Sequence, residues 1–166
     1  LEFRRVLFRS TTATPDILES IVTPSNDAFL NLPNPSTGNV ASMAALNIGA
    51  AGSVTFTPSD TPVGGSPRNL PLNLSICQIN PSTAACINPT TPGPSATVNM
   101  ANGQFAYFGL FVSPTGTFIP TDPANNRLYV IPRVGSTAVG QQSVALKMLS
   151  ADQAPAEVAG SAEAAR

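Results

Sequence analysis

Histidine and tryptophan are absent from this 166-residue sequence, and charged residues make up only 10% of it. Without His, neither a Ser-His-Asp nor a Cys-His catalytic arrangement can be assembled. The sequence contains no glycine-rich phosphate-binding motif. Its 8 basic and 9 acidic residues leave a net charge of -1, so it has no surplus of positive charge with which to release counterions from a nucleic acid. These absences argue against His-assisted hydrolysis, nucleotide chemistry and nucleic-acid binding.

Long hydrophobic runs are also absent. The apolar stretches are short and are interrupted by Pro, Gly or Asn, whereas a membrane-spanning helix needs about 20 consecutive apolar residues. We therefore expect no insertion into a membrane.

Acidic residues are few in the central part of the chain, and each lies near turn-forming residues. They are Asp16, Glu19, Asp27, Asp60 and Asp122. Acids in turns are usually solvated or accept hydrogen bonds, so we expect no catalytic pair of carboxyl groups. Asp122, Asn125 and Asn126 could supply oxygen ligands to calcium, but the loop lacks the spaced acids of a calcium site, so an Asx turn at Asp122 is the favoured interpretation. The sequence thus predicts a protein that is not an enzyme and has no metal or cofactor.

Only two cysteines occur, Cys77 and Cys86, on either side of an eight-residue, turn-rich connection. They could form a hairpin disulfide, half of a metal site, or two unrelated thiols. A zinc site usually has four Cys or His ligands, and the chain has no His and no second Cys pair. The disulfide is the favoured interpretation, and it indicates an oxidising compartment.

The two ends differ in composition from the rest. The first ten residues, LEFRRVLFRS, contain three of the eight basic residues, and LFRS resembles the translated end of a sequencing adapter. The last residues are rich in Ala and Glu. We expect a non-native or disordered arm at 1–13, a folded domain at 14–149 and a disordered tail at 150–166, within a fragment of a longer protein.

Turn-forming residues recur every 8 to 15 positions between Thr11 and Met148, which is typical of an all-β protein. Between them lie eight segments with period-2 patterning or β-branched and aromatic enrichment. These predicted strands are 16–22, 40–48, 53–57, 70–79, 96–100, 105–112, 127–131 and 143–148.

Alternation within these segments predicts which side chains share a face. Leu72, Leu74 and Ile76 should lie on one face of their strand, and the pattern recurs in 143–148. Short alternating strands without crossover helices favour two antiparallel sheets packed face to face. We predict an immunoglobulin-like β-sandwich of about seven to nine strands, with a closed barrel or a jelly roll as alternatives.

An aromatic run, Phe105 to Val112, is apolar on both faces. The simpler interpretation is a central strand buried on both sides. The alternative is a ligand surface, for which Tyr107, Phe111 and Tyr129 are the candidate residues. A shallow exposed cluster of two or more of Phe105, Tyr107, Phe111 and Tyr129 would favour ligand binding. Burial of all four side chains would favour a structural spacer.

Two sets of residues carry a resemblance to known modules. Pro15-Asp16-Ile17, 45–52 (ALNIGAAG) and Val54-Thr55-Phe56 resemble the opening of CARDB-like and related immunoglobulin-like modules of bacterial exported proteins. Leu70-Pro71-Leu72, the Cys-x8-Cys element at 77–86 and 120–127 (PTDPANNR) are similar to repeated modules of large proteobacterial surface proteins of unknown role. The resemblance implies a secreted, multi-domain setting and supplies no catalytic residues. This chain departs from the pattern around 135–142, where the expected charged hairpin is neutral.

Two hypotheses about function follow. The first is a non-catalytic structural or adhesive module of a secreted or cell-surface bacterial protein. The second is a ligand-binding accessory module, for example for carbohydrate, of an exported enzyme. The expected location is extracellular, at the cell surface or in the periplasm. The expected partners are neighbouring domains of the same longer protein, an extracellular protein or a glycan.

Overall fold

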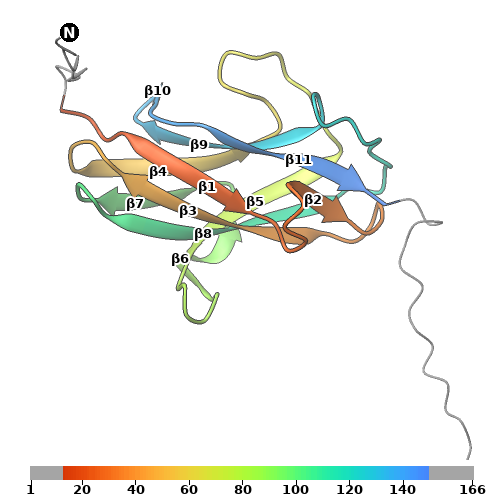
Figure 1. The fold of residues 1–166 in the computed structure, drawn as a ribbon, viewed down its shortest axis with the longest axis horizontal. Coiled ribbons are helices and arrows are strands. Elements are labelled where there is room, and N and C mark those ends of the chain that lie inside the picture. The colour runs from red at the N-terminus through yellow and green to blue at the C-terminus, as the bar shows by residue number, and fades with distance from the viewer. Residues whose placement is uncertain (1–12, 150–166) are drawn as a thin grey trace, which may run out of the picture.

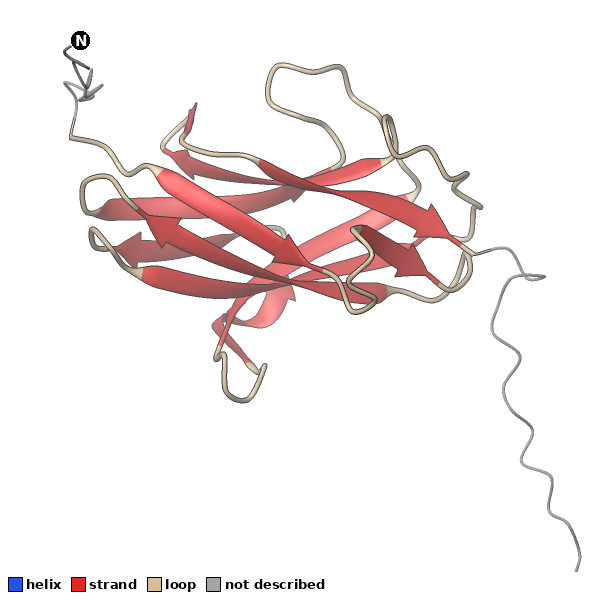
Figure 2. Cartoon of the chain, viewed as in Figure 1, coloured by secondary structure: helices blue, strands red, loops and turns tan. Residues whose placement is uncertain are grey.

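Turn residues divide the chain into eleven strands in the computed structural model, which describes residues 13–149 (Figure 1). No helix occurs within this range (Figure 2). Five strands form sheet A, in the order β1 (Ile17–Val22), β3 (Asn39–Asn47), β8 (Phe105–Pro114), β5 (Leu72–Ile79) and β6 (Cys86–Gly93). Sheet B has the order β2 (Phe29–Leu32), β11 (Gln142–Met148), β9 (Arg127–Val134), β4 (Gly52–Ser59) and β7 (Ala96–Met100), and β10 (Thr137–Ala138) also pairs with β9.

The predicted all-β sandwich is confirmed, and all eight predicted strands are present. The strand count exceeds seven to nine because β2, β6 and β10 were not predicted. β2 and β10 are only 4 and 2 residues long, and β6 contains Pro89 and Pro92. Proline is tolerated at a sheet edge, which is where β6 lies. The predicted 1–13 arm and the 150–166 tail lie outside the described residues except for Ala13.

The segment that contains β1 and β2 passes from one sheet to the other. β1 pairs antiparallel with β3, whereas β2 pairs parallel with β11, the one parallel pair among the described strands. Between them the chain turns at Asn26 and Ala28, which both have positive φ (51° and 65°). The sandwich is therefore not wholly antiparallel, because the chain leaves sheet A after β1 and adds β2 to sheet B parallel to β11.

Side chains of alternating residues fill the space between the sheets. Phe56 of β4 and Phe108 of β8 are fully buried, and their ring centroids lie 4.3 Å apart, across the two sheets. Ile76 is fully buried, and Leu72 and Leu74 pack partly buried against the same cluster, as predicted. The core is thus built by period-2 patterning from both sheets.

A buried asparagine holds one end of the sandwich together. Asn47 is fully buried; its Oδ1 accepts hydrogen bonds from the N–H groups of Asp16 (3.1 Å) and Gly49 (3.0 Å). Its Nδ2 donates to the carbonyl oxygens of Ala50 (2.8 Å) and Met100 (3.1 Å). A Cβ at Gly49 would collide with the backbone of Thr14 and Asp16. Asn47 and Gly49 together fix the β3–β4 turn against the start of β1.

Candidate binding surface

A disulfide joins Cys77 of β5 to Cys86 of β6, as predicted, with a Cα separation of 5.6 Å. It lies at the base of the hairpin between these strands. The turn is closed by Asn80, whose N–H donates to the carbonyl of Ala85 and whose Oδ1 accepts from the N–H of Ser82. Figure 1 shows this hairpin projecting from the sandwich on the side of sheet A. The disulfide therefore anchors a protruding element.

The outer face of β8 is exposed, so the expectation that this strand is buried on both sides is wrong. Phe105 is 55% exposed and Tyr107 is 38% exposed. Their ring centroids lie 6.4 Å apart, with planes within 13° of parallel. β8 is central within sheet A, yet no second layer of the described residues covers its outer side. Two exposed aromatics meet the criterion that favours a binding surface.

The three aromatic residues proposed for a ligand surface do not lie together. Tyr107 and Phe111 lie on the outer face of β8, but Tyr129 belongs to β9 in sheet B. Phe111 is half-buried, since its ring lies over Gly109, where an added Cβ would come within 3.0 Å of it. Sequence periodicity identified the aromatic positions, but not the sheet to which each strand belongs.

Cross-strand register places small residues of this face next to a row of large ones. Ala44 of β3 lies opposite Ser20 on β1 and Tyr107 on β8, and the next row joins Leu18, Leu46 and Phe105. Ser42 lies opposite Val22 and Gly109 in the row on the other side. We call this depression the β3 furrow: its floor is Ser20, Ser42 and Ala44, and its walls are Leu18 and Val22 on β1 and Phe105 and Tyr107 on β8.

Two hollows lie along the β3 furrow. One, of about 220 Å³, is bordered by Leu18, Leu46 and Phe105. The other, of about 340 Å³, is bordered by Val22, Tyr107 and Pro81 of the projecting hairpin. Both hollows include Ser20 and Ala44 in their linings, so they are neighbours, with Leu46 beside one and the hairpin beside the other.

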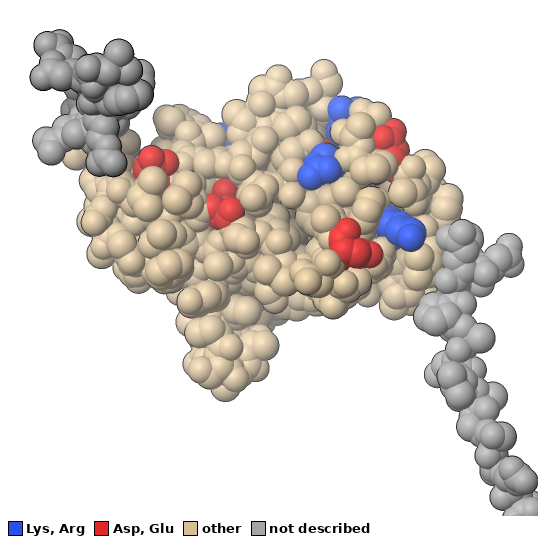
Figure 3. Space-filling view, in the orientation of Figure 1, with Lys and Arg blue, Asp and Glu red and all other residues tan. Residues whose placement is uncertain are grey.

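Charge is almost absent from sheet A. Among its five strands only β1 contains a charged residue, Glu19. In Figure 3 the charged atoms lie over β1, β2, β11 and the loops near sheet B, whereas β3, β8 and the β5–β6 hairpin show none. Seven of the nine large hydrophobic residues that are exposed within residues 13–149 belong to the strands of sheet A or directly follow β3: Leu18, Val22, Val40, Ile48, Ile87, Phe105 and Tyr107. This outer face is therefore an uncharged, largely apolar surface.

Glu19 does not contribute its charge to this face. Both carboxylate oxygens are buried without a hydrogen-bond partner among residues 13–149, and Oε2 would lie 3.3 Å from a Cβ added at Gly140. Burial raises the pKa of Glu19 to about 8. The expectation that every acid would be solvated or hydrogen-bonded is thus wrong for Glu19, because it points inward from a strand. A general acid must reach its substrate, and these enclosed oxygens offer no such access.

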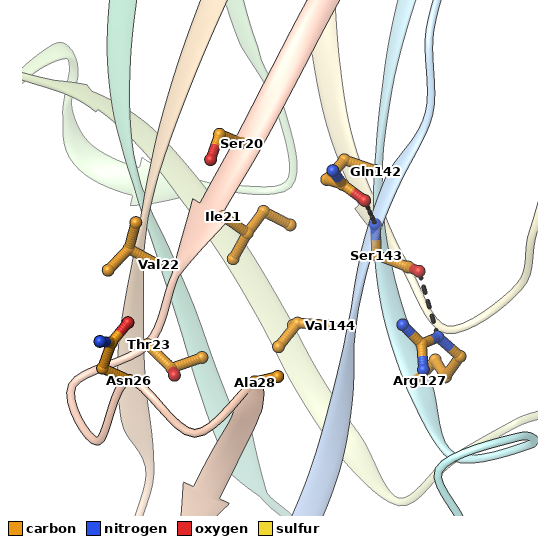
Figure 4. A pocket seen from close by; sticks show the side chains of 10 residues that line it. All are labelled: Ser20, Ile21, Val22, Thr23, Asn26, Ala28, Arg127, Gln142, Ser143 and Val144. Carbon is orange, nitrogen blue, oxygen red and sulfur yellow. Dashed lines mark hydrogen bonds between the residues drawn. The ribbon is translucent and has the colours of Figure 1, made fainter.

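A third hollow, of about 320 Å³, lies where β1 passes β11 (Figure 4). Arg127 and Gln142 in its lining are engaged by the protein, whereas Thr23 Oγ1 is buried without a hydrogen-bond partner among the described residues. Arg127 donates from Nε to Ser143 Oγ (3.1 Å) and from Nη1 to the Pro123 carbonyl (2.8 Å). Gln142 donates from Nε2 to the carbonyl of Glu19 (3.2 Å), and its Oε1 accepts from the N–H of Ser143 (2.8 Å). No carboxylate lines this hollow, so it fits a seam between the two sheets better than a reaction site.

The carboxylates of Asp27 and Asp122 accept hydrogen bonds within local turns. Asp122 accepts hydrogen bonds from the N–H groups of Ala124 and Asn125 (both 3.1 Å) and from Asn125 Nδ2 (2.7 Å), which confirms the Asx turn. The bond from the Asn125 side chain lowers the pKa of Asp122. Hydrogen bonds from Ser25 and Asn31 lower the pKa of Asp27 to about 2. Residues 13–149 contain no group of three or more side chains suited to binding a metal ion.

Within the part of the chain that the structure describes, no helix is long and apolar enough to cross a membrane.

Comparison with known proteins identifies no family for this chain. No protein-family model matches the sequence, and no curated protein matches it. Among solved structures, the chain is similar to the β-glucosidase from Listeria innocua at 12% sequence identity and a TM-score of 0.34. The match covers 80% of this chain and spans only 16% of the glucosidase. Fold and surface together define a disulfide-anchored β-sandwich domain with one uncharged outer face.

Sequence reasoning missed the β1 wall and the floor of the furrow. Leu18 and Val22 alternate with Ile17 and Ile21, so β1 is apolar on both faces and its pattern does not say which one is covered. The small residues of β3 form a depression only because their cross-strand neighbours are larger, and the sequence does not identify those neighbours. The one available signal was the scarcity of charge, since Glu19 is the single charged residue of β1, β3 and β8.

Proposed function

We propose that this domain is a non-catalytic adhesive module of a secreted or cell-surface bacterial protein, and that it holds its partner on the outer face of sheet A. The observation that carries the proposal is the exposed Phe105–Tyr107 pair within an uncharged face. Large exposed apolar patches on soluble domains usually mark interaction sites. The disulfide supports an oxidising, extracellular setting, and the family resemblance supports a longer surface protein.

The chemistry of the described residues supports binding in preference to turnover. The one carboxyl group whose pKa is raised is enclosed, and the turn acids have lowered pKa values or local hydrogen bonds. The furrow itself contains hydroxyl groups and apolar side chains. A general base suited to neutral pH usually comes from His or from an accessible carboxylate with a raised pKa.

The test uses the full 166-residue chain on beads and three probe surfaces: a neutral polysaccharide, an anionic polysaccharide, and a surface coated with the same chain. We expect retention on at least one surface. F105S/Y107S should abolish it, while F118S should not, because Phe118 is 49% exposed but lies outside sheet A. Such exposed substitutions should change the free energy of unfolding by only about 0.5 kcal/mol each.

Two outcomes contradict the proposal. One is no retention on any of the three surfaces. The other is retention that is unaffected in F105S/Y107S, which would place the contact elsewhere on the molecule. Release of a chemically altered product from any probe would contradict the non-catalytic part.

A further inference from the structure

The width of the β3 furrow suits a single extended polymer chain. Its two walls lie on β1 and β8, which are separated by β3 alone. Two strand spacings amount to roughly 9 to 10 Å. Ser20, Ser42 and Ala44 form a low floor between the walls, and Leu46, level with Leu18 and Phe105, closes one end. A flat partner would bridge this depression and leave it unfilled.

The lining combines aromatic faces with hydroxyl groups and carries no charge. Phe105 and Tyr107 present nearly parallel rings on one wall. Ser20 and Ser42 are exposed on the floor, and Tyr107 carries a third hydroxyl. The ring faces of a pyranose are apolar C–H surfaces, while its hydroxyls project from the ring edge. Such a ring can stack on the aromatics and direct hydroxyls toward the serines and toward water.

An extended peptide fits this furrow less well. The backbone groups of β1, β3 and β8 are engaged in the ladders of sheet A, and the furrow lies on the face of that sheet. A peptide lying there would leave its own N–H and C=O groups over apolar side chains, which is costly. Sugar hydroxyls at the ring edge escape this cost because they remain in contact with solvent.

A charged ligand also fits poorly. The single charged residue in the strands of sheet A is Glu19, whose carboxylate is buried on the inner side of β1 and contributes only backbone to the furrow. A uronate or sulfate would therefore lose hydration without gaining a cation. An uncharged surface complements an uncharged ligand.

We propose that the β3 furrow binds a short stretch of a neutral, linear polysaccharide, which lies along β3 between the Phe105–Tyr107 and Leu18–Val22 walls, with Leu46 at one end and Pro81 of the hairpin at the other. This inference rests on the proposed adhesive function and names its ligand class. The two neighbouring hollows, of about 220 and 340 Å³, act as adjacent subsites for successive sugar rings. The disulfide holds the hairpin, and with it Pro81, at the end of the furrow.

The experiment measures binding of soluble hexasaccharides to the full chain by calorimetry. The probes are cellohexaose, mannohexaose and chitohexaose, with an anionic hexaguluronate for comparison. We expect binding to at least one neutral probe and none to hexaguluronate. Y107A and F105A should each weaken binding about tenfold through loss of ring stacking, whereas F118A should leave it unchanged.

A furrow-filling variant separates a glycan from a flat apolar partner. A44L raises the floor and should abolish glycan binding, although it makes the face more apolar. S113L, which adds the same side chain on the outer face of β8 away from the furrow, should bind normally. S42L provides a second block if A44L does not fold. Glycan binding that survives both A44L and S42L overturns the inference, and so does preference for hexaguluronate.

Failure of this inference differs from failure of the adhesive function. If the chain binds none of the neutral hexasaccharides but still adheres to itself through Phe105 and Tyr107, the glycan proposal is wrong and the adhesive one stands. If F105S/Y107S binds every probe as the wild type does, the glycan proposal and the adhesive proposal are both wrong.

Discussion

Two polar side chains inside this sandwich, those of Asn47 and Glu19, differ in how many hydrogen bonds the protein makes to them. Asn47 is fully buried with four hydrogen bonds that reach from β1 to the end of β7. Glu19 is buried with none to its carboxylate among the described residues. A satisfied buried amide stabilises and specifies a fold, whereas an unsatisfied carboxyl destabilises it when ionised. The two residues therefore lead to opposite predictions.

Substitution of Asn47 should be costly. Asn47→Ala removes four hydrogen bonds made by a fully buried side chain, one of them buried and three part-buried, so the free energy of unfolding should fall by about 3 kcal/mol. Asn102→Ala is the control, because the exposed Asn102 side chain donates to the carbonyls of Ile48 and Gly49 at the same turn. Urea denaturation measures both. A larger loss in N102A than in N47A would show that Asn47 does not hold this end of the sandwich.

Glu19 should make stability fall as the pH rises. Its pKa is about 8 in the folded protein and near 4.5 when unfolded, so the folded state binds more protons between these values. The stability that Glu19 contributes is then fully present below about pH 4.5 and is lost progressively as the pH rises to about 8. Each pKa unit corresponds to about 1.4 kcal/mol, so the total loss amounts to several kcal/mol at most.

The measurement is the unfolding midpoint of the wild type and of Glu19→Gln between about pH 5 and about pH 9. Glu19→Gln should flatten the profile because it removes the titrating group. Asp27→Asn should retain the wild-type slope in this window, since the pKa of Asp27 lies at about 2 in the folded protein. A wild-type profile as flat as that of Glu19→Gln would contradict the burial of this carboxyl.

At the scale of elements, the edges of sheet A are protected by different means. β6 carries Pro89 and Pro92 and is tied to β5 by the disulfide. β1 is covered in part by the segment that follows β10: Ile17 N–H donates to the Val139 carbonyl, and Gln142 donates to the carbonyl of Glu19. Proline and covering side chains are common ways of blocking edge-to-edge association.

The disulfide should stabilise the hairpin locally as well as the whole domain. It closes a loop with a sequence separation of 9 residues, for which the chain-entropy model gives roughly 2 to 3 kcal/mol. C77S/C86S should lose about that much, and its amides at 79–86 should exchange faster than those of β3 and β8. Hydrogen exchange followed by mass spectrometry measures both regions. Equal acceleration throughout sheet A would mean that the disulfide does not act on the hairpin in particular.

At the scale of the whole molecule, the two sheets are joined by side chains that meet in the middle. Phe56 and Phe108 come from different sheets and contact each other at the centre of the core. Leu30 and Leu32 of the short β2 are fully buried as well. The outer face of sheet A is left uncovered, because the described chain forms only two layers.

Phe108→Ala should destabilise the entire domain. Removal of a fully buried Phe costs about 3 to 5 kcal/mol, whereas Phe118→Ala, at a 49% exposed position, should cost about 0.5 kcal/mol. The double variant F56A/F108A should lose less than the sum of the two single losses, because both remove the same contact. Additive losses in this cycle would indicate that the two rings do not couple the sheets.

The sequence by itself determined the positions of eight of the eleven described strands, the disulfide pair and the chemistry that the chain lacks. These are local properties: alternation sets which side chains share a face, turn residues set where strands end, and a short connection brings Cys77 and Cys86 together. The even-numbered side chains of 72–76 were correctly assigned to one face for this reason. Residue types alone also showed that no His-based mechanism can operate.

Tertiary structure alone decided which apolar face of β8 is covered and that Tyr129 lies in the other sheet. It also decided that β2 pairs with β11 in parallel and that Glu19 points inward. Each depends on pairing between segments far apart in the chain, as between Ala44 and Tyr107 across β3 and β8. Period-2 patterning separates two faces but does not name their neighbours. The β3 furrow exists only because register places small residues of one strand between large residues of two others.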